Sequence, residues 1–225
     1  HEHDFGVIRV GNDDNWDVII ANIGVQELVI DQVIVEGDEF STNFENELII
    51  PGGEERTLIA TFAPQGSGDF AGSLAIFSND FELDGGPVNV TLSGSGILAE
   101  LAVDPAEVDF GAFIFGESRD ANIMLSNSGD AVLTISELQI GGDEFTSNWD
   151  GEDVVLDPEG SEEFTLTFGP DAEGDFEGML TVISDDPFNG EADIRLFGTG
   201  LPQPPPVIGL NEQDYNFGDV FVDGF

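Results

Sequence analysis

The sequence contains no cysteine, and all four of its basic residues are arginines, so it also contains no lysine. The absence of thiols excludes disulfides and thiolate metal sites, so any core must hold together by packing alone. The absence of lysine excludes Schiff-base chemistry and Lys–Asn cross-links. No apolar run approaches the ~20 residues that span a bilayer, and no signal peptide is recognisable.

Positive charge is almost missing. Four Arg stand against 47 Asp and Glu, which gives a formal net charge of −43. Such a surface repels nucleic acid and anionic lipid, so neither is expected as a partner. It also repels itself, and either high ionic strength or bound divalent cations would offset that repulsion. A halophile's solvated acidic surface and specific calcium sites are both compatible with this composition.

Catalytic groups are also scarce. The only histidines are His1 and His3, at a terminus expected to be frayed, so no Ser–His or Cys–His arrangement is available. These two residues and the terminal amine could hold a transition metal, or they could form an ordinary polar end. Acid pairs are so abundant that no single pair indicates a glycosidase. The sequence therefore predicts no enzyme.

An internal repeat is the strongest positive feature of the sequence. Asp4–Gly24 ("DFGVIRVGNDDNWDVIIANIG") aligns with Asp109–Gly129 ("DFGAFIFGESRDANIMLSNSG") at an offset of 105. The match continues through "GDEFSTNF" over "GDEFTSNW" and "GDFAGSLAIFSND" over "GDFEGMLTVISDD", and it closes with "LSGSG" over "LFGTG". The chain thus holds two copies of one unit, each about 100 residues long.

Each unit shows the two-residue period of half-buried strands. In the second copy Phe164, Leu166 and Phe168 are expected to point inward, and Arg195 is expected to point outward between Ile194 and Leu196. Turn sequences such as "NSGD" and "DPEG" recur about every ten residues, and no stretch keeps a helical period. The predicted fold class is all-β, with tandem immunoglobulin-like β-sandwiches of about seven strands each.

The "VDFG" entry, the "NSG" turn, the "G.F.G.L.I.S.D" strand and the closing "L.G.G" resemble Hydin-type (ASH-like) immunoglobulin domains. They are also similar to the bacterial or archaeal surface repeats called choice-of-anchor D. The resemblance implies tandem modules in large surface or filamentous assemblies, and it supplies no catalytic residues. Its motifs are turn glycines and core aromatics, so it identifies a fold rather than an activity.

Two clusters of oxygen-bearing side chains are candidate calcium sites, because Ca²⁺ takes six to eight oxygen ligands from flexible loops. Solvated acidic hairpins are the alternative. The candidate ligands are Asp185, Asp186, Asn189, Glu191 and Asp193 in the second copy and Asn79, Asp80 and Asp84 in the first. Sugar stacking is considered for Trp16, Phe44, Trp149 and Phe188; Phe44 and Trp149 occupy the same repeat position, which favours packing instead.

The two ends of the chain are expected to be complementary. Residues 1–97 form a sandwich that lacks its first strand, and 98–200 form a complete one. A Pro-rich linker follows at 201–206, and 207–225 repeat the opening of the unit as a possible donor strand. The residues expected to form this polymerisation strand are Val207, Ile208, Leu210, Tyr215, Phe217, Val220 and Phe221.

The predicted function is a structural subunit of an extracellular or cell-surface filament. Copies would join head to tail as the donor strand of one copy completes the first domain of the next. The alternative is a fragment of a long tandem stalk, or a calcium-dependent adhesin that binds a glycan or protein on another cell. The expected partners are thus other copies of the chain, with no membrane span.

Overall fold

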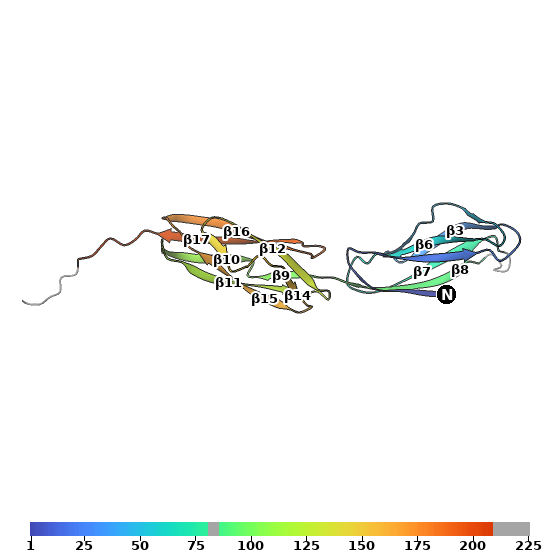
Figure 1. Cartoon of the computed structure of the whole chain (residues 1–225), viewed down its shortest axis with the longest axis horizontal. Helices are drawn as coiled ribbons and strands as arrows, with labels where there is room; N and C mark the ends of the chain where they lie inside the picture. The colour runs from blue at the N-terminus through green and yellow to red at the C-terminus, as the bar shows by residue number, and fades with distance from the viewer. Residues whose placement is uncertain (81–85, 209–225) are drawn as a thin grey trace, which may run out of the picture.

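The structure is a computed structural model that describes residues 1–80 and 86–208, and it consists of two β-sandwiches placed end to end (Figure 1). The described residues form strands, turns and connecting segments, and none of them forms a helix long and apolar enough to cross a membrane. Residues 202–208 leave the end of the second sandwich that lies farthest from the first (Figure 1).

The first domain packs a five-stranded sheet on a three-stranded sheet. The larger sheet has the order β1 (Glu2–Arg9), β8 (Val88–Ile97), β7 (Gly68–Ser78), β3 (Leu28–Glu36) and β5 (Leu48–Ile50). The smaller sheet has the order β2 (Asp14–Ala21), β6 (Glu55–Phe62) and β4 (Phe40–Thr42). β1 pairs with β8 in parallel, and the other pairs in this domain are antiparallel.

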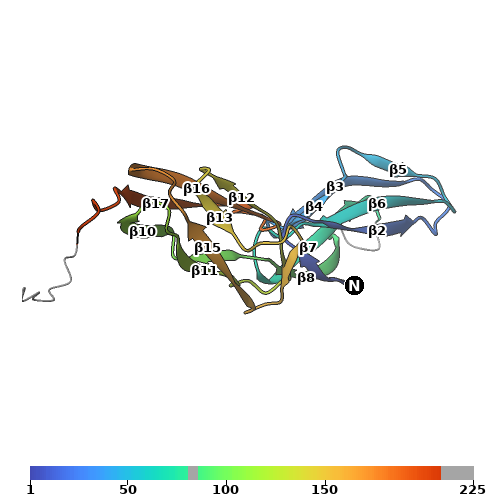
Figure 2. The same ribbon diagram turned by 60° about the vertical axis from the view of Figure 1, so that its left-hand side comes forward.

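The second domain repeats this plan with one strand more. Its larger sheet has the order β10 (Glu107–Ile114), β17 (Glu191–Leu201), β16 (Gly174–Ser184), β12 (Leu133–Gly141) and β14 (Val154–Leu156). Its smaller sheet has the order β13 (Phe145–Ser147), β15 (Ser161–Phe168), β11 (Arg119–Asn127) and β9 (Leu101–Asp104). Figure 2 shows the two sandwiches from a second side.

The all-β, immunoglobulin-like fold class is confirmed, and so is the predicted direction of the strand faces. Phe164, Leu166 and Phe168 are buried in β15, whereas Arg195 is exposed in β17. The strand count exceeds the expected seven, because each domain carries additional three-residue strands (β4 and β5, β13 and β14). Short edge strands of this kind leave little sequence periodicity.

The repeated "DFG" motif forms a β-bulge in the first strand of each unit. The parallel register shifts between Asp4 and Val7, and Gly6 there has a φ of 71°. The Asp4 carboxylate accepts a hydrogen bond from the Gly6 amide at 3.0 Å, which fixes the bulge. Glycine is required because a side chain disfavours this left-handed backbone. The bulge turns Phe5 into the core, where it is 6% exposed.

The closing glycines make room for the largest buried ring of each core. A Cβ at Gly94 would lie 2.6 Å from the Phe62 ring, and a Cβ at Gly198 would overlap the Phe168 ring in the same way. Both rings are 0% exposed. The "L.G.G" motif is therefore a packing device that lets a phenylalanine lie flat on β8 or β17.

Candidate functional site

The acidic turn between β16 and β17, for which the sequence predicts calcium ligands, divides its side chains among separate hydrogen bonds. Asp185 accepts a bond from the Thr134 amide at 2.8 Å. Asp186, at 6% exposure, accepts bonds from the amides of Leu101, Phe188 and Asn189.

Two further residues of this turn lie at or in β17. Asp193 accepts a bond from the Thr181 hydroxyl at 2.6 Å, and Glu191 begins β17 as an exposed residue. The carboxylates of Asp185, Asp186 and Asp193 thus bind separate groups in the loop, the domain joint and the sheet.

The corresponding residues of the first domain have similar roles. The Asn79 side chain accepts a bond from the Val29 amide at 2.9 Å and donates one to the Glu27 carbonyl at 3.2 Å. The Asp80 amide donates to the Ser78 hydroxyl. Asp84 lies outside the described residues. Within residues 1–80 and 86–208 no group of three or more His, Asp or Glu side chains is placed to hold a metal ion.

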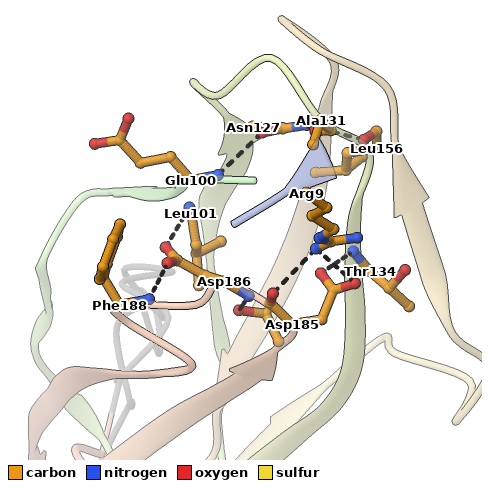
Figure 3. Close-up of polar contacts among 11 residues, drawn as sticks. Arg9, Glu100, Leu101, Asn127, Ala131, Thr134, Leu156, Asp185, Asp186 and Phe188 are labelled. Carbon is orange, nitrogen blue, oxygen red and sulfur yellow. Dashed lines mark hydrogen bonds and ion pairs between the residues drawn. The ribbon is translucent and has the colours of Figure 1, made fainter. Parts of the chain in front are cut away.

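Polar contacts between the two domains gather at their joint (Figure 3). The Arg9 guanidinium, at the end of β1, forms an ion pair with the Asp185 carboxylate at 2.9 Å and donates to the Asp185 carbonyl at 3.0 Å. Val10, the next residue, is 6% exposed, and its amide donates to the Ile97 carbonyl. Three elements distant in sequence therefore meet at this point.

The connecting segment 98–100 lies against the Asn127–Ala131 loop of the second domain. The Leu98 carbonyl accepts bonds from the amides of Asp130 and Ala131, and the Glu100 carbonyl accepts one from the Ser128 amide. In return the Leu98 amide donates to the Asp130 carboxylate at 2.7 Å. The linker is therefore held by the loop as an extra strand would be, which restricts motion at the joint.

Asp130 is the one carboxylate whose pKa the structure clearly moves, among the residues it describes. Hydrogen bonds from the Ser67 hydroxyl at 2.5 Å and from the Leu98 amide hold its pKa below the ordinary value of 3.8. Both donors favour the ionised form. Because the folded pKa is depressed, the stabilising contribution is complete above about pH 3.8 and is lost as the pH falls through the folded pKa.

We therefore expect acid to loosen the joint in the wild type but not in the Asp130→Asn variant, which lacks the titrating group. The side chain is exposed, so the change should be small, ~0.5 kcal/mol. Distance distributions between spin labels on the two domains, recorded from pH 2.5 to 6, measure it. Asp31→Asn, an exposed carboxylate on β3, is the control and should keep the wild-type profile. An unchanged acid response in Asp130→Asn would contradict this assignment.

An open sheet edge distinguishes the first domain from the second. In the second domain β9 pairs antiparallel with β11, setting Leu101 opposite Asn127 and Val103 opposite Leu125. In the first domain β2 takes the place of β11 and pairs with β6 on its other side. No strand among the described residues lies on the outer edge of β2. Accordingly Leu125 is fully buried, whereas its counterpart Ile20 is partly exposed.

The two equivalent asparagines show the same difference in atomic detail. The Asn22 and Asn127 side chains each donate to two carbonyls, and each accepts a bond from the amide two residues later. Asn127 also accepts a bond from the Glu100 amide at 3.3 Å, and that donor belongs to the linker. The loop after β2 is therefore preformed in the shape that holds a linker in the second domain.

The free end of the first domain is apolar where the inner joint is polar. Ile23 is 98% exposed and Val25 is 97% exposed. Their counterparts at the joint are Ser128 and Asp130. A cleft of about 580 Å³ lies at this end and is lined by residues 21–28 together with Asn79 and Asp80.

The predicted polymerisation strand lies mostly beyond the described part of the chain. Val207 and Ile208 are described, and they are 90% and 88% exposed. Leu210, Tyr215, Phe217, Val220 and Phe221 lie outside the described residues.

The aromatic candidates divide into core and surface residues. Trp16, Phe44 and Trp149 pack against the cores, as the shared repeat position of Phe44 and Trp149 suggested, and Phe188 is 67% exposed. The frayed N-terminus expected from the sequence is wrong, because Glu2 already begins β1. His3 stacks on Trp16 with ring centroids 4.1 Å apart.

Sequence reasoning did not identify the joint, and it considered Asp185 and Asp186 only as candidate calcium ligands. Arg9 and Asp185 are 176 positions apart, and nothing in the repeat links them. Asn22 and Asn127 did appear in the repeat alignment, and their shared position in the two copies was the available signal. Asp130 gave a weaker signal, because the residue at the same position of the first copy, Val25, is apolar.

Comparisons with known proteins agree on both domains. Residues 94–192 match the family model for ASH (abnormal spindle-like microcephaly-associated, ASPM-SPD-2-Hydin), and residues 1–95 match the model for HYDIN/CFA65/VesB-like immunoglobulin-like domains. No curated protein sequence matches the chain significantly.

The solved structures that match the chain share little sequence with it. The ASH/PapD-like domain 7 of human CEP192 is 13% identical, with a TM-score of 0.39, over 48% of this chain and 89% of that one. A Porphyromonas gingivalis W83 protein of unknown function is 17% identical, with a TM-score of 0.39, over 86% and 94%. The secreted serine protease VesC of Vibrio cholerae is 14% identical, with a TM-score of 0.34, over 75% and 45%.

Proposed function

The chain consists of Hydin-type, ASH-like immunoglobulin domains, and from this premise we propose that it is a non-enzymatic structural subunit of an extracellular or cell-surface filament. Domains of this class serve structural or binding roles. Copies of the chain join head to tail, and each contact adds a strand from one copy to the first domain of the next.

The observation that carries the proposal is the outer edge of β2. The same edge of β11 is covered by β9, so the fold has a defined position for one more strand. An uncovered edge presents unpaired amides and carbonyls and invites pairing with an extended segment. Strand addition of this kind gains affinity from the backbone and specificity from alternate side chains.

The proposed donor is the segment 207–225, whose sequence repeats the opening of the second unit. "DYNFGDVFVDGF" aligns with "EVDFGAFIFGES", which spans β10 and the turn after it, and the same offset sets residues 208–211 ("IGLN") at the positions of β9 (Leu101–Asp104). Residues 208–211 are therefore the part proposed to cover the edge of β2. The segment follows residues 202–206, which point away from the first domain (Figure 1). Residues 202–206 and the first domain thus lie at opposite ends of the described part of the chain (Figure 1), and a head-to-tail contact between copies propagates rather than closes.

A second candidate uses the same edge differently. In a longer array of such domains, the segment 207–225 would begin a third domain of its own chain. The mass of the natural protein distinguishes the two, because donation fits a mature chain near 24.0 kDa and an array requires a chain several times larger.

Removal of residues 202–225 should abolish assembly, since it removes the donor and leaves both sandwiches intact. The full chain is expected to form long polymers at ~1 M NaCl, where screening limits the repulsion between subunits. The truncated chain is expected to remain a monomer. Sedimentation velocity and electron microscopy of the two chains measure the difference.

The matched control keeps the composition and changes only the order of residues 207–217. This scrambled chain should behave as the truncated one. Polymers of the truncated or scrambled chain, or a full chain that stays monomeric under all salt conditions, would refute strand donation.

A further inference from the structure

We propose that the loop Asn22–Gln26 is a specificity lock that admits the Pro-rich segment of a second copy and fixes the register of the added strand. This inference rests on the strand donation proposed above and adds the contacts that select the donor. Its template is the joint inside the chain, where the corresponding loop holds residues 98–100.

The register follows from the repeat. Phe217 corresponds to Phe110, and the same offset sets Ile208 at the position of Leu101 and Pro205 at that of Leu98. Leu101 lies opposite Asn127 in β11, so Ile208 of one copy lies opposite Asn22 of the next. Three residues, 202–204, then remain as an additional spacer that the inner joint lacks.

Compared with the inner joint, the proposed contact between copies lacks one hydrogen-bond donor and also the acceptor of that donor. At the inner joint the Leu98 amide donates to the Asp130 carboxylate. In the proposed contact position 98 is replaced by Pro205, which has no amide hydrogen, and position 130 is replaced by Val25, which has no acceptor. A proline facing a carboxylate would leave that charge without its partner. Val25, at 97% exposure, instead offers an apolar surface to the proline ring.

The other hydrogen bonds of the linker require only loop groups that the loop Asn22–Gln26 of the first domain also has. The carbonyls of residues 98 and 100 accept bonds from backbone amides of the loop. The counterparts of those amides belong to Ile23, Val25 and Gln26, and none of the three has a partner in the described part of the chain. Pro205 and Val207 supply the two carbonyls, and the Val207 amide can reach the Asn22 side-chain oxygen as the Glu100 amide reaches Asn127.

The proposed contact also differs from the inner joint at both positions of the interdomain ion pair. The inner joint contains the Arg9–Asp185 ion pair. In the repeat, Ile114 is the counterpart of Arg9, and Asn79 is the counterpart of Asp185. The two ends that would meet between copies therefore cannot form this ion pair. The two joints are built from different chemistry, so Leu98, whose amide needs an acceptor, does not fit the apolar lock as well as Pro205 does.

Three engineered chains test the lock. Val25→Asp should weaken assembly by about tenfold or more, because it places a carboxylate against a proline; tenfold corresponds to ~1.4 kcal/mol. Pro205→Leu combined with Val25→Asp recreates the pair of the inner joint and should restore most of the loss. Val7→Asp, on the exposed face of β1, adds the same charge elsewhere and should assemble as the wild type does. The critical concentration of polymer formation, from sedimentation at ~1 M NaCl, is the readout.

Cysteine pairs test the register, since the chain has no cysteine of its own. Ser126 lies opposite Ala102, so Ala21→Cys with Gly209→Cys should give a disulfide ladder beyond the dimer on non-reducing gels. The shifted pair Ala21→Cys with Leu210→Cys places one thiol on the opposite face and should not.

Each outcome has a defined meaning. A ladder from the shifted pair alone, or no rescue by Pro205→Leu, would overturn the lock and leave strand donation standing. No ladder from either pair, together with monomeric wild type, would overturn both. Because Val25 is almost fully exposed, circular dichroism of Val25→Asp should match that of the wild type and exclude misfolding.

Discussion

Replacement of Phe168 by alanine is expected to lower the free energy of unfolding of the second domain by about 3–5 kcal/mol. The ring is fully buried at the centre of four others, with centroids 4.8 Å from Phe145, 5.5 Å from Phe113, 5.6 Å from Phe110 and 5.8 Å from Phe176. Its loss removes apolar burial and aromatic pairing, and it opens a cavity that Gly198 cannot fill. No disulfide compensates, because the chain has no cysteine.

Calorimetry should resolve this as a shift of one transition. For a domain of this size a 3 kcal/mol loss lowers the Tm by about 12–24 °C. Phe62→Ala, the matched change in the first domain, should move the other transition, and Phe188→Ala, at 67% exposure, should move neither. Equal shifts of both transitions in Phe168→Ala would show that the domains do not unfold separately.

The second large effect concerns salt. Raising NaCl from ~0.01 M to ~1 M is expected to increase the free energy of unfolding by ~2 kcal/mol or more per domain, because the Debye length falls from ~30 Å to ~3 Å. Two like charges 8 Å apart repel by ~0.5 kcal/mol in water, and many such pairs exist in a chain with 47 acids and four arginines. Arginine offsets little of this repulsion, because the described residues contain only three ion pairs against the 47 acids of the chain. Denaturant titration at several salt concentrations measures the change.

Calcium provides the comparison that separates screening from specific binding. A specific site should raise the Tm at micromolar to millimolar CaCl₂, whereas NaCl of equal ionic strength should not. Equal effects of the two salts would support screening alone. Loss of stability with rising NaCl would contradict the repulsion argument, because it would mean that attractive charge pairs dominate.

The strands and their buried faces could be predicted from particular residues. Phe164, Leu166 and Phe168 alternate with polar neighbours. This period of two residues is the one that a strand with one buried face requires. The "DFG" repeat also located the first strand, although the bulge at Gly6 and Gly111 becomes visible only in the backbone. Three-residue strands such as β4 and β13 were beyond prediction, since they carry too few side chains to show a period.

The candidate site was harder to predict, because its partners come from distant segments. Asp185 and Asp186 looked like two neighbours in one acidic loop. In the fold Asp185 pairs with Arg9 of the other domain, and Asp186 binds the amide that opens β9. An oxygen-rich loop has the same composition whether it holds a cation or caps backbone amides, so only the arrangement of the amides separates the two.

The sequence by itself determined that this protein has two copies of one disulfide-free β unit with an extremely acidic surface. Composition and local periodicity are sufficient for that, because they depend on residue type and spacing alone. Only the tertiary structure decided which sheet edge is covered, which carboxylates join the domains, and that the loop after β2 has the shape of one that holds a linker. Those properties arise where segments that are separate in sequence meet, as Arg9 and Asp185 do across 176 positions, and local residue patterns do not specify such contacts.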